Sequence, residues 1–142
     1  MAFTCLSVMA QSPPSLTLSN GVYLIRNQQD MDTFVAWANN PLNANYSFSF
    51  RVDALPPAVA PQTLTVSNII TQFRGVFDGN NRTFILPPGA PNGLFAKLIY
   101  KPNSFGTDVT TVRNVIIQGA IANFNAVNIG GLAGFVEVPV II

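Results

Sequence analysis

The alternation of apolar and polar residues along the chain predicts many short strands. Residues 22–26 follow the turn signal Asn20-Gly21, and their first four positions are apolar, which is typical of a strand. From residue 46 every second position is apolar, which predicts a half-buried strand with Tyr46, Phe48, Phe50 and Val52 on one face. Further short apolar runs, separated by Gly, Pro and Asn, continue to residue 142. The pattern favours an all-β fold.

One segment has the periodicity of a helix instead. Four apolar residues at i, i+3, i+4 and i+7 form a single stripe, namely Met31, Phe34, Val35 and Ala38. Asn27 is a suitable N-cap, and Asp30 lies in the first turn, where a carboxylate interacts favourably with the helix dipole. We therefore expect one amphipathic helix near residues 27–39.

Glycines recur beside bulky apolar residues in three places. The segment 73–84 predicts a strand, a tight Asp-Gly-Asn turn and a second strand, and residues 93–95 and 130–134 again place a bulky residue after glycine. The side chain of a turn aspartate bonds to nearby backbone amides, so this is the role expected at position 78. The predicted turn-forming residues are Gly75, Asp78, Gly79, Asn80, Gly130, Gly131 and Gly134.

The strands are spaced irregularly, with Asn and Gly at their corners in place of hairpin turns. This arrangement favours a short right-handed parallel β-helix, a solenoid in which each rung contacts only its neighbours, over a β-sandwich. The expected domain comprises residues 21–142, with the helix near 27–39 as its cap. Residues 1–20 are expected to form an extended N-terminal arm, since Pro13-Pro14 fits neither a helix interior nor a central strand.

The order of the glycine motifs resembles a known family. The pattern F-x-G-x-F-D-G-N occupies residues 73–80, and it is followed by G-L-F, V-x-N-V and G-G-L-A-G at 93–95, 112–115 and 130–134. Together with the opening at 23–34 and the strand at 46–53, these motifs resemble bacterial surface proteins with GLUG-type repeats, over residues 21–136. The resemblance implies a right-handed parallel β-helix with a helix at its first rung, of the kind found in adhesins. Many members of that family are not enzymes.

Charged residues make up only 9% of the chain, and the formal net charge is +1. Such a surface gives little repulsion between copies, as in an Asn- and Thr-rich extracellular domain or in a subunit covered by neighbours. The seven Lys and Arg residues are scattered, which argues against nucleic-acid binding, and no apolar run approaches a membrane span. We expect no cleavable signal peptide, because residues 1–10 lack a positive charge and Thr4 and Ser7 interrupt the apolar stretch.

Few residues offer catalytic chemistry. The chain has no histidine, and Asp30 and Asp32 point apart on the predicted helix. We predict no catalytic, metal-binding or cofactor-binding residues and no enzyme activity. Exposed aromatic residues would suit a glycan, but a place in the core is the favoured interpretation of Tyr23, Trp37, Tyr46 and Tyr100.

The predicted function is that of a structural subunit, whose partners are copies of itself and which assembles head to tail into an extracellular fibre or cell-surface appendage. The apolar arm would add to a neighbouring subunit, and the last strand would lie on an uncovered rung, since G-G-L-A-G occurs here once and several times in the family. Cys5 would either cross-link copies or be buried. The expected interface is Phe3, Cys5, Leu6, Val8, Leu16, Leu18, Val136, Val138, Val140 and Ile142. The alternatives are an adhesin or glycan-binding module and, third, a polysaccharide-active enzyme.

Overall fold

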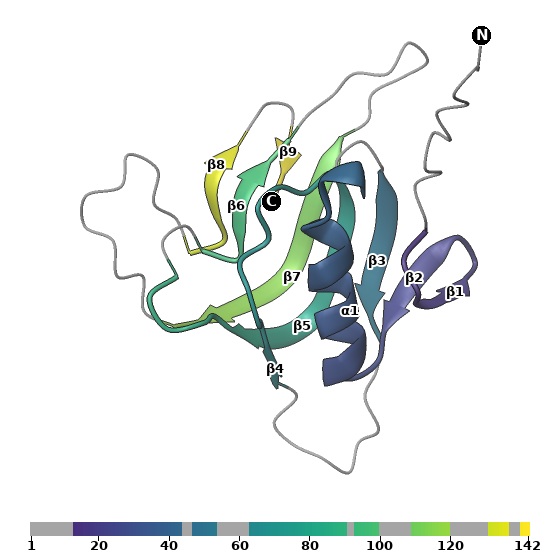
Figure 1. Cartoon of the computed structure of the whole chain (residues 1–142), viewed down its shortest axis with the longest axis horizontal. Helices are drawn as coiled ribbons and strands as arrows, with labels where there is room; N and C mark the ends of the chain where they lie inside the picture. The colour runs from purple at the N-terminus through teal and green to yellow at the C-terminus, as the bar shows by residue number, and fades with distance from the viewer. Residues whose placement is uncertain are drawn as a thin grey trace, which may run out of the picture.

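The protein consists mainly of β-strands and contains one α-helix, as the sequence predicted. The computed structural model describes residues 13–43, 47–53, 63–90, 93–99, 109–119, 131–136 and 140–142. Its elements, shown in Figure 1, are β1 (Thr17–Ser19), β2 (Val22–Ile25), α1 (Gln28–Ala38), the 3-10 helix η1 (Pro41–Asn43), β3 (Phe48–Val52), β4 (Thr63–Thr65), β5 (Gly75–Ile85), β6 (Phe95–Leu98), β7 (Thr110–Gln118), β8 (Ala133–Val136) and β9 (Val140–Ile141).

The main sheet is almost entirely parallel. Its strand order is β1-β2-β3-β5-β7-β9, with β4 as an additional partner of β5. Only β1 is antiparallel, to β2. The hairpin between them turns at Asn20 and Gly21, which both have positive φ, 50° and 77°, as a type I′ turn requires. Residues 17–19 of the expected arm therefore pair with the strand that follows them.

The two long strands β5 and β7 each bend at a corner, and Figure 1 shows their curvature. The register between them shifts between Asp78 and Arg82. Asn80, Asn81 and Asn114 have left-handed φ values of 49°, 58° and 56°, which asparagine tolerates better than most residues. Each long strand therefore supplies two segments, one for the ladder with β3 and one for a second ladder that begins at β4.

A third parallel ladder joins β6 to β8 and is extended by bridges from Ile70 to Phe95 and from Phe73 to Leu98. In-register parallel pairing aligns side chains at matching positions of successive strands. The aligned sets are Tyr23, Phe50, Phe77 and Val112; Leu64, Phe84 and Ile117; Ile70, Phe95 and Ala133; and Phe73, Leu98 and Val136. Most of these side chains belong to one hydrophobic core.

The helix α1 covers part of this core, and its predicted position and buried face are confirmed. The side chain of Asn27 accepts a hydrogen bond from the backbone of Asp30, and the whole apolar stripe is buried. The ring of Phe34 lies 4.7 Å from that of Phe50 and 5.2 Å from that of Phe77, between centroids. In Figure 1 the helix accordingly lies across β3 and β5.

Two glycines are required by close backbone approach. A Cβ atom on Gly75 would collide with the carbonyl oxygen of Phe48, and the φ of Gly75 is +123°. A Cβ atom on Gly79 would lie 2.6 Å from the carbonyl oxygen of Asn114 and 2.8 Å from a methyl group of Val115. Side chains at these positions would therefore push apart β3, β5 and β7.

We predict that Gly79→Ala lowers the free energy of unfolding by about 1–3 kcal/mol, because the new methyl group overpacks the corner. Gly131→Ala is the matched control, since no heavy atom lies within 4 Å of its added Cβ. It should change the free energy by less than about 1 kcal/mol. Urea unfolding followed by circular dichroism measures both. Equal losses in the two variants would contradict the assigned packing.

Candidate functional site

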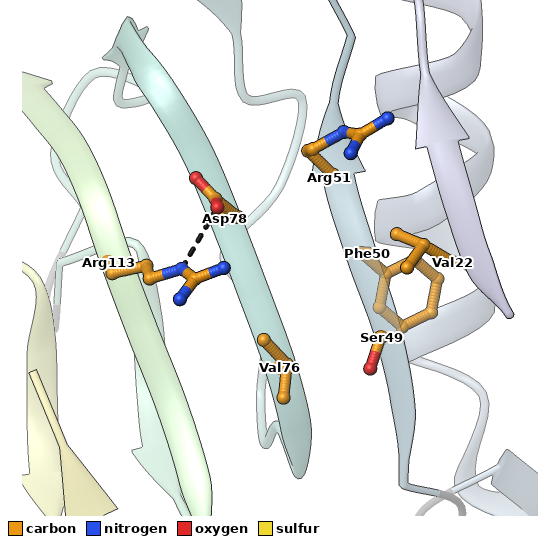
Figure 2. Close-up of a pocket in the computed structure, with 7 residues that line it drawn as sticks. All are labelled: Val22, Ser49, Phe50, Arg51, Val76, Asp78 and Arg113. Atoms are coloured by element: carbon orange, nitrogen blue, oxygen red, sulfur yellow. Dashed lines mark hydrogen bonds and ion pairs between the residues drawn. The ribbon is translucent and has the colours of Figure 1, made fainter. Parts of the chain in front are cut away.

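A shallow hollow lies on the outer face of the main sheet. Its volume is about 160 Å³, and it is shown in Figure 2. Four neighbouring strands, β2, β3, β5 and β7, supply its lining residues, which are Val22, Ser49, Phe50, Arg51, Val76, Asp78 and Arg113. Val22, Ser49 and Val76 are aligned across three strands, and they form a mostly apolar row.

The second row of the hollow is charged. Parallel register aligns Arg51 with Asp78 and Asp78 with Arg113. Adjacent strands lie about 4.8 Å apart, so the two arginines stand on either side of one carboxylate. Figure 2 shows Asp78 and Arg113 pointing toward each other, whereas Arg51 extends away from that pair.

Asp78 is held by three donors at the corner of β5. Its carboxylate accepts hydrogen bonds from Arg113 Nε at 2.9 Å, Asn114 Nδ2 at 3.0 Å and the backbone nitrogen of Asn80 at 3.0 Å. Burial raises the pKa of the Asp78 carboxyl, but the hydrogen bonds from Asn114, Asn80 and Arg113, together with the charge of Arg113, outweigh it and place the pKa below its usual range. A carboxylate so engaged is an acceptor and a poor proton donor.

Both arginines remain accessible to a ligand. The side chain of Arg113 is 59% exposed and uses its Nε for Asp78. No hydrogen bond or ion pair joins the side chain of Arg51 to another described residue, and Arg51 is exposed. Guanidinium groups bind oxyanions such as carboxylate and sulfate. The hollow therefore has groups that can bind an anion, and its lining residues form no acid–base pair for catalysis.

The predicted turn-forming residues fall into two groups. Gly75 and Gly79 occupy the close approaches described above, and Asp78, which lies between them in the sequence, accepts a hydrogen bond from the backbone nitrogen of Asn80. Gly131 precedes β8 and Gly134 lies in it. These two groups lie in different sheets, so the structure does not bring them together. Gly130 lies outside the described residues.

The expected interface residues lie in different parts of the fold. Leu16 is half-buried against the core, and Leu18 on β1 is 56% exposed. Val136 in β8 is 37% exposed and Ile142 is 69% exposed, while Val140 begins β9. Strands β1 and β9 stand at opposite ends of the main sheet. The remaining expected residues, Phe3, Cys5, Leu6, Val8 and Val138, lie outside the described residues.

The aromatic residues considered for glycan binding are placed in or beside the core where they are described. Tyr23 is 8% exposed, and its ring stacks on that of Phe50 at 5.6 Å. Trp37 is half-buried and packs against Phe48 and Phe50. Tyr46 and Tyr100 lie outside the described residues. Neither Tyr23 nor Trp37 lines the hollow on the outer face.

The sequence reasoning missed the charged row in the hollow. Arg51, Asp78 and Arg113 each directly follow one residue of the aligned interior set Phe50, Phe77 and Val112. The sequence shows that each charged residue follows an interior apolar residue, but only the strand register shows that the three lie side by side. Within the described ranges, no three His, Cys, Asp or Glu residues lie together as metal ligands, and no helix is long and apolar enough to cross a membrane.

Comparison of the chain with protein-family models, with curated proteins and with solved structures gives no match.

We predict that Asp78 stabilises the fold at neutral pH and loses this effect in acid. Its native pKa is lowered, so the stabilisation is full above the ordinary aspartate pKa of about 4 and disappears as the pH falls through the native value. Asp78→Asn should lower the free energy of unfolding at pH 7 by about 1–2 kcal/mol and should flatten the acid dependence.

The control for this prediction is Asp53→Asn, because Asp53 lies just after β3 and its side chain makes no hydrogen bond or ion pair with another described residue. Urea unfolding between pH 7 and pH 3 compares the two variants with the parent. A steep acid dependence that persists in Asp78→Asn would contradict the role assigned to this carboxylate.

Proposed function

We propose that the chain is a structural subunit built on a short right-handed parallel β-helix. The observation that supports this proposal is the set of three in-register parallel ladders with aligned side chains in a shared core. Successive parallel strands in one sheet are almost always joined by right-handed crossovers, which supports the handedness. A stack of this kind provides rigid length from short repeated units.

We further propose that copies associate head to tail into a fibre or appendage at the cell surface. Low charge supports self-association, because only 9% of the residues are charged and copies repel one another weakly. Edge strands support it too: among the described residues, β1 pairs only with β2, β9 only with β7 and β8 only with β6. An edge strand can accept a strand from another chain.

In this proposal the N-terminal arm of one copy adds as a strand to the edge of the next copy that lies opposite β1. Residues 1–12 carry the apolar side chains Phe3, Leu6 and Val8 and precede β1. Main-chain hydrogen bonds would supply affinity, and alternate side chains would supply specificity. A head-to-tail contact whose rotation does not close a ring propagates into a filament.

Deletion of residues 1–12 tests the arm without removing Leu16, which packs against the core, or β1. We expect the parent protein to form filaments visible by negative-stain electron microscopy and the deletion variant to sediment as a monomer. A variant that keeps the full length but replaces Phe3, Leu6 and Val8 by Ser separates side-chain contacts from chain length. Filaments formed by the deletion variant would contradict the arm's role.

The hollow on the outer face favours one alternative, an adhesin-like module that binds acidic glycans. Arg51 and Arg113 are exposed there beside an apolar row that includes Val22 and Val76. A sugar ring that carries a carboxylate or sulfate group would place its anion at the guanidinium groups and its apolar face on the valines. This binding does not depend on assembly.

For this alternative, we predict that Arg51→Gln and Arg113→Gln each weaken binding of a polygalacturonate oligosaccharide by about tenfold, since each removes one charge-assisted contact. Arg26→Gln is the control, because Arg26 is an exposed arginine that pairs with Asp30 outside the hollow. Isothermal titration calorimetry on the deletion variant measures the affinities. A neutral oligosaccharide that binds equally well would contradict anion recognition.

A further inference from the structure

The two ends of α1 carry amide side chains that bind strand backbone. Gln28, the first residue of the helix, donates from Nε2 to the carbonyl oxygen of Thr65 at 2.7 Å and accepts at Oε1 from the Thr65 backbone nitrogen at 2.9 Å. Asn39, its C-cap, donates from Nδ2 to the carbonyl oxygen of Ile69 at 2.9 Å and accepts at Oδ1 from the Thr71 backbone nitrogen at 2.8 Å. Each side chain therefore donates one hydrogen bond to the backbone of another segment and accepts one from it.

These amides make hydrogen bonds of the kind that the backbone of a neighbouring strand makes. A side-chain amide presents one carbonyl and N–H donors, as a peptide group does. Thr65 ends β4, the first strand of the second ladder, and residues 69–71 surround the Ile70 bridge that begins the third ladder. The helix thus supplies hydrogen bonds to the first segment of both ladders. The side chain of Asp32 accepts from Gln28 Nε2 at 3.0 Å and helps to orient that amide.

Burial differs between the two ends of the ladders. At the end beside α1, Leu64, Ile70 and Phe73 are 2%, 0% and 3% exposed. At the other end, Ile117 and Ala133 are only half-buried and Val136 is 37% exposed. The core is therefore covered at the helix end and less covered at the end formed by β7 and β8.

The backbone is open at that same end. Residues 115–118 of β7 pair with β5 on one side, and β8 pairs with β6 on one side, with no further pairing among the described residues. Large apolar side chains are also exposed there, with Ile116 at 51% and Phe135 at 44%. Exposed apolar edge strands of this kind are templates for added strands.

We infer that Gln28 and Asn39 seal one edge of the second and third ladders, and that the opposite edge, on β7 and β8, receives the N-terminal arm of a second copy. The partner rests on the proposed function, whereas the seal does not. Since β1 and β9 lie at opposite ends of the main sheet, head-to-tail stacking brings the arm that precedes β1 of one copy toward the β7 and β8 edge of the next. Twelve extended residues span up to about 40 Å, which is enough to follow such an edge.

The first experiment closes the receiving edge with a charge. Val136→Lys places an ammonium group on the last of the aligned residues Phe73, Leu98 and Val136. Position 136 is partly exposed, so the lysine side chain can reach solvent. Leu42→Lys is the control, because Leu42 is an exposed apolar residue, at 52%, on η1. In sedimentation velocity we expect Val136→Lys to be monomeric and Leu42→Lys to assemble like the parent. Assembly by Val136→Lys would overturn the assignment of the receiving edge.

The second experiment opens the sealed edge. In the Val136→Lys background, the pair Gln28→Ala and Asn39→Ala exposes the backbone of residues 65 and 69–71, and association should return. The pair Gln28→Glu and Asn39→Asp loses the same amide donors but leaves a carboxylate at each position, so this variant should stay monomeric. Circular dichroism confirms that both are folded, and the melting temperatures show whether they are destabilised alike.

The outcomes of the second experiment separate the inference from the proposed function. If the alanine pair stays monomeric, or if both pairs associate equally, the amides are not seals. If the parent itself is monomeric, the proposed assembly is wrong, but the seal is still tested in the parent background. There the alanine pair must sediment faster than the parent, and the acidic pair must not.

Discussion

The packing of Phe34 into an aromatic cluster is the contact on which the rest of the structure depends. Phe34 is fully buried, and its ring contacts those of Phe50, Phe73 and Phe77. These three residues belong to β3, to the third ladder and to β5, so one side chain joins the helix to two ladders. Loss of a buried Phe side chain typically costs about 3–5 kcal/mol, a large share of the roughly 5–15 kcal/mol that stabilises a domain.

The position of the helix determines what its ends can do. With Phe34 fixed against the core, Gln28 and Asn39 lie beside the first segments of the second and third ladders. The same contact therefore covers the core and places both amides against open backbone. One edge of the second and third ladders is consequently hydrogen-bonded and buried by the helix, whereas the opposite edge is exposed. This difference gives the proposed assembly its direction.

Local patterns were sufficient to predict the helix and several strands. The stripe Met31, Phe34, Val35 and Ala38 and the cap at Asn27 depend on residues within one turn or two, so the sequence shows them directly. The expected β-rich fold with one helix is confirmed. The parallel β-helix, which would arrange those strands as rungs, stays a proposal supported by the pairing of the strands.

Features that depend on long-range register were not predictable in the same way. Gln28 forms a hydrogen bond with Thr65, which is 37 residues away in the sequence, and Asn39 forms one with Thr71, which is 32 residues away. No local sequence pattern indicates either contact. The alignment of Arg51, Asp78 and Arg113 likewise follows from strand pairing. The pairing of residues 17–19 with β2 was missed, although the Asn20-Gly21 turn was visible, because a local pattern does not show whether a short strand pairs within its own copy or with another one.

Residue-resolved amide hydrogen exchange tests most directly whether the ladders are covered at one end and open at the other. The account predicts strong protection for the backbone amides of Thr65 and Thr71, which are bonded by the helix amides, and for β3 and β5. It predicts weaker protection in β8 than in β3 and β5, because β8, like β1 and β9, pairs on one side only among the described residues. Fast exchange at Thr65 and Thr71 together with strong protection of β8 in the monomer would contradict it.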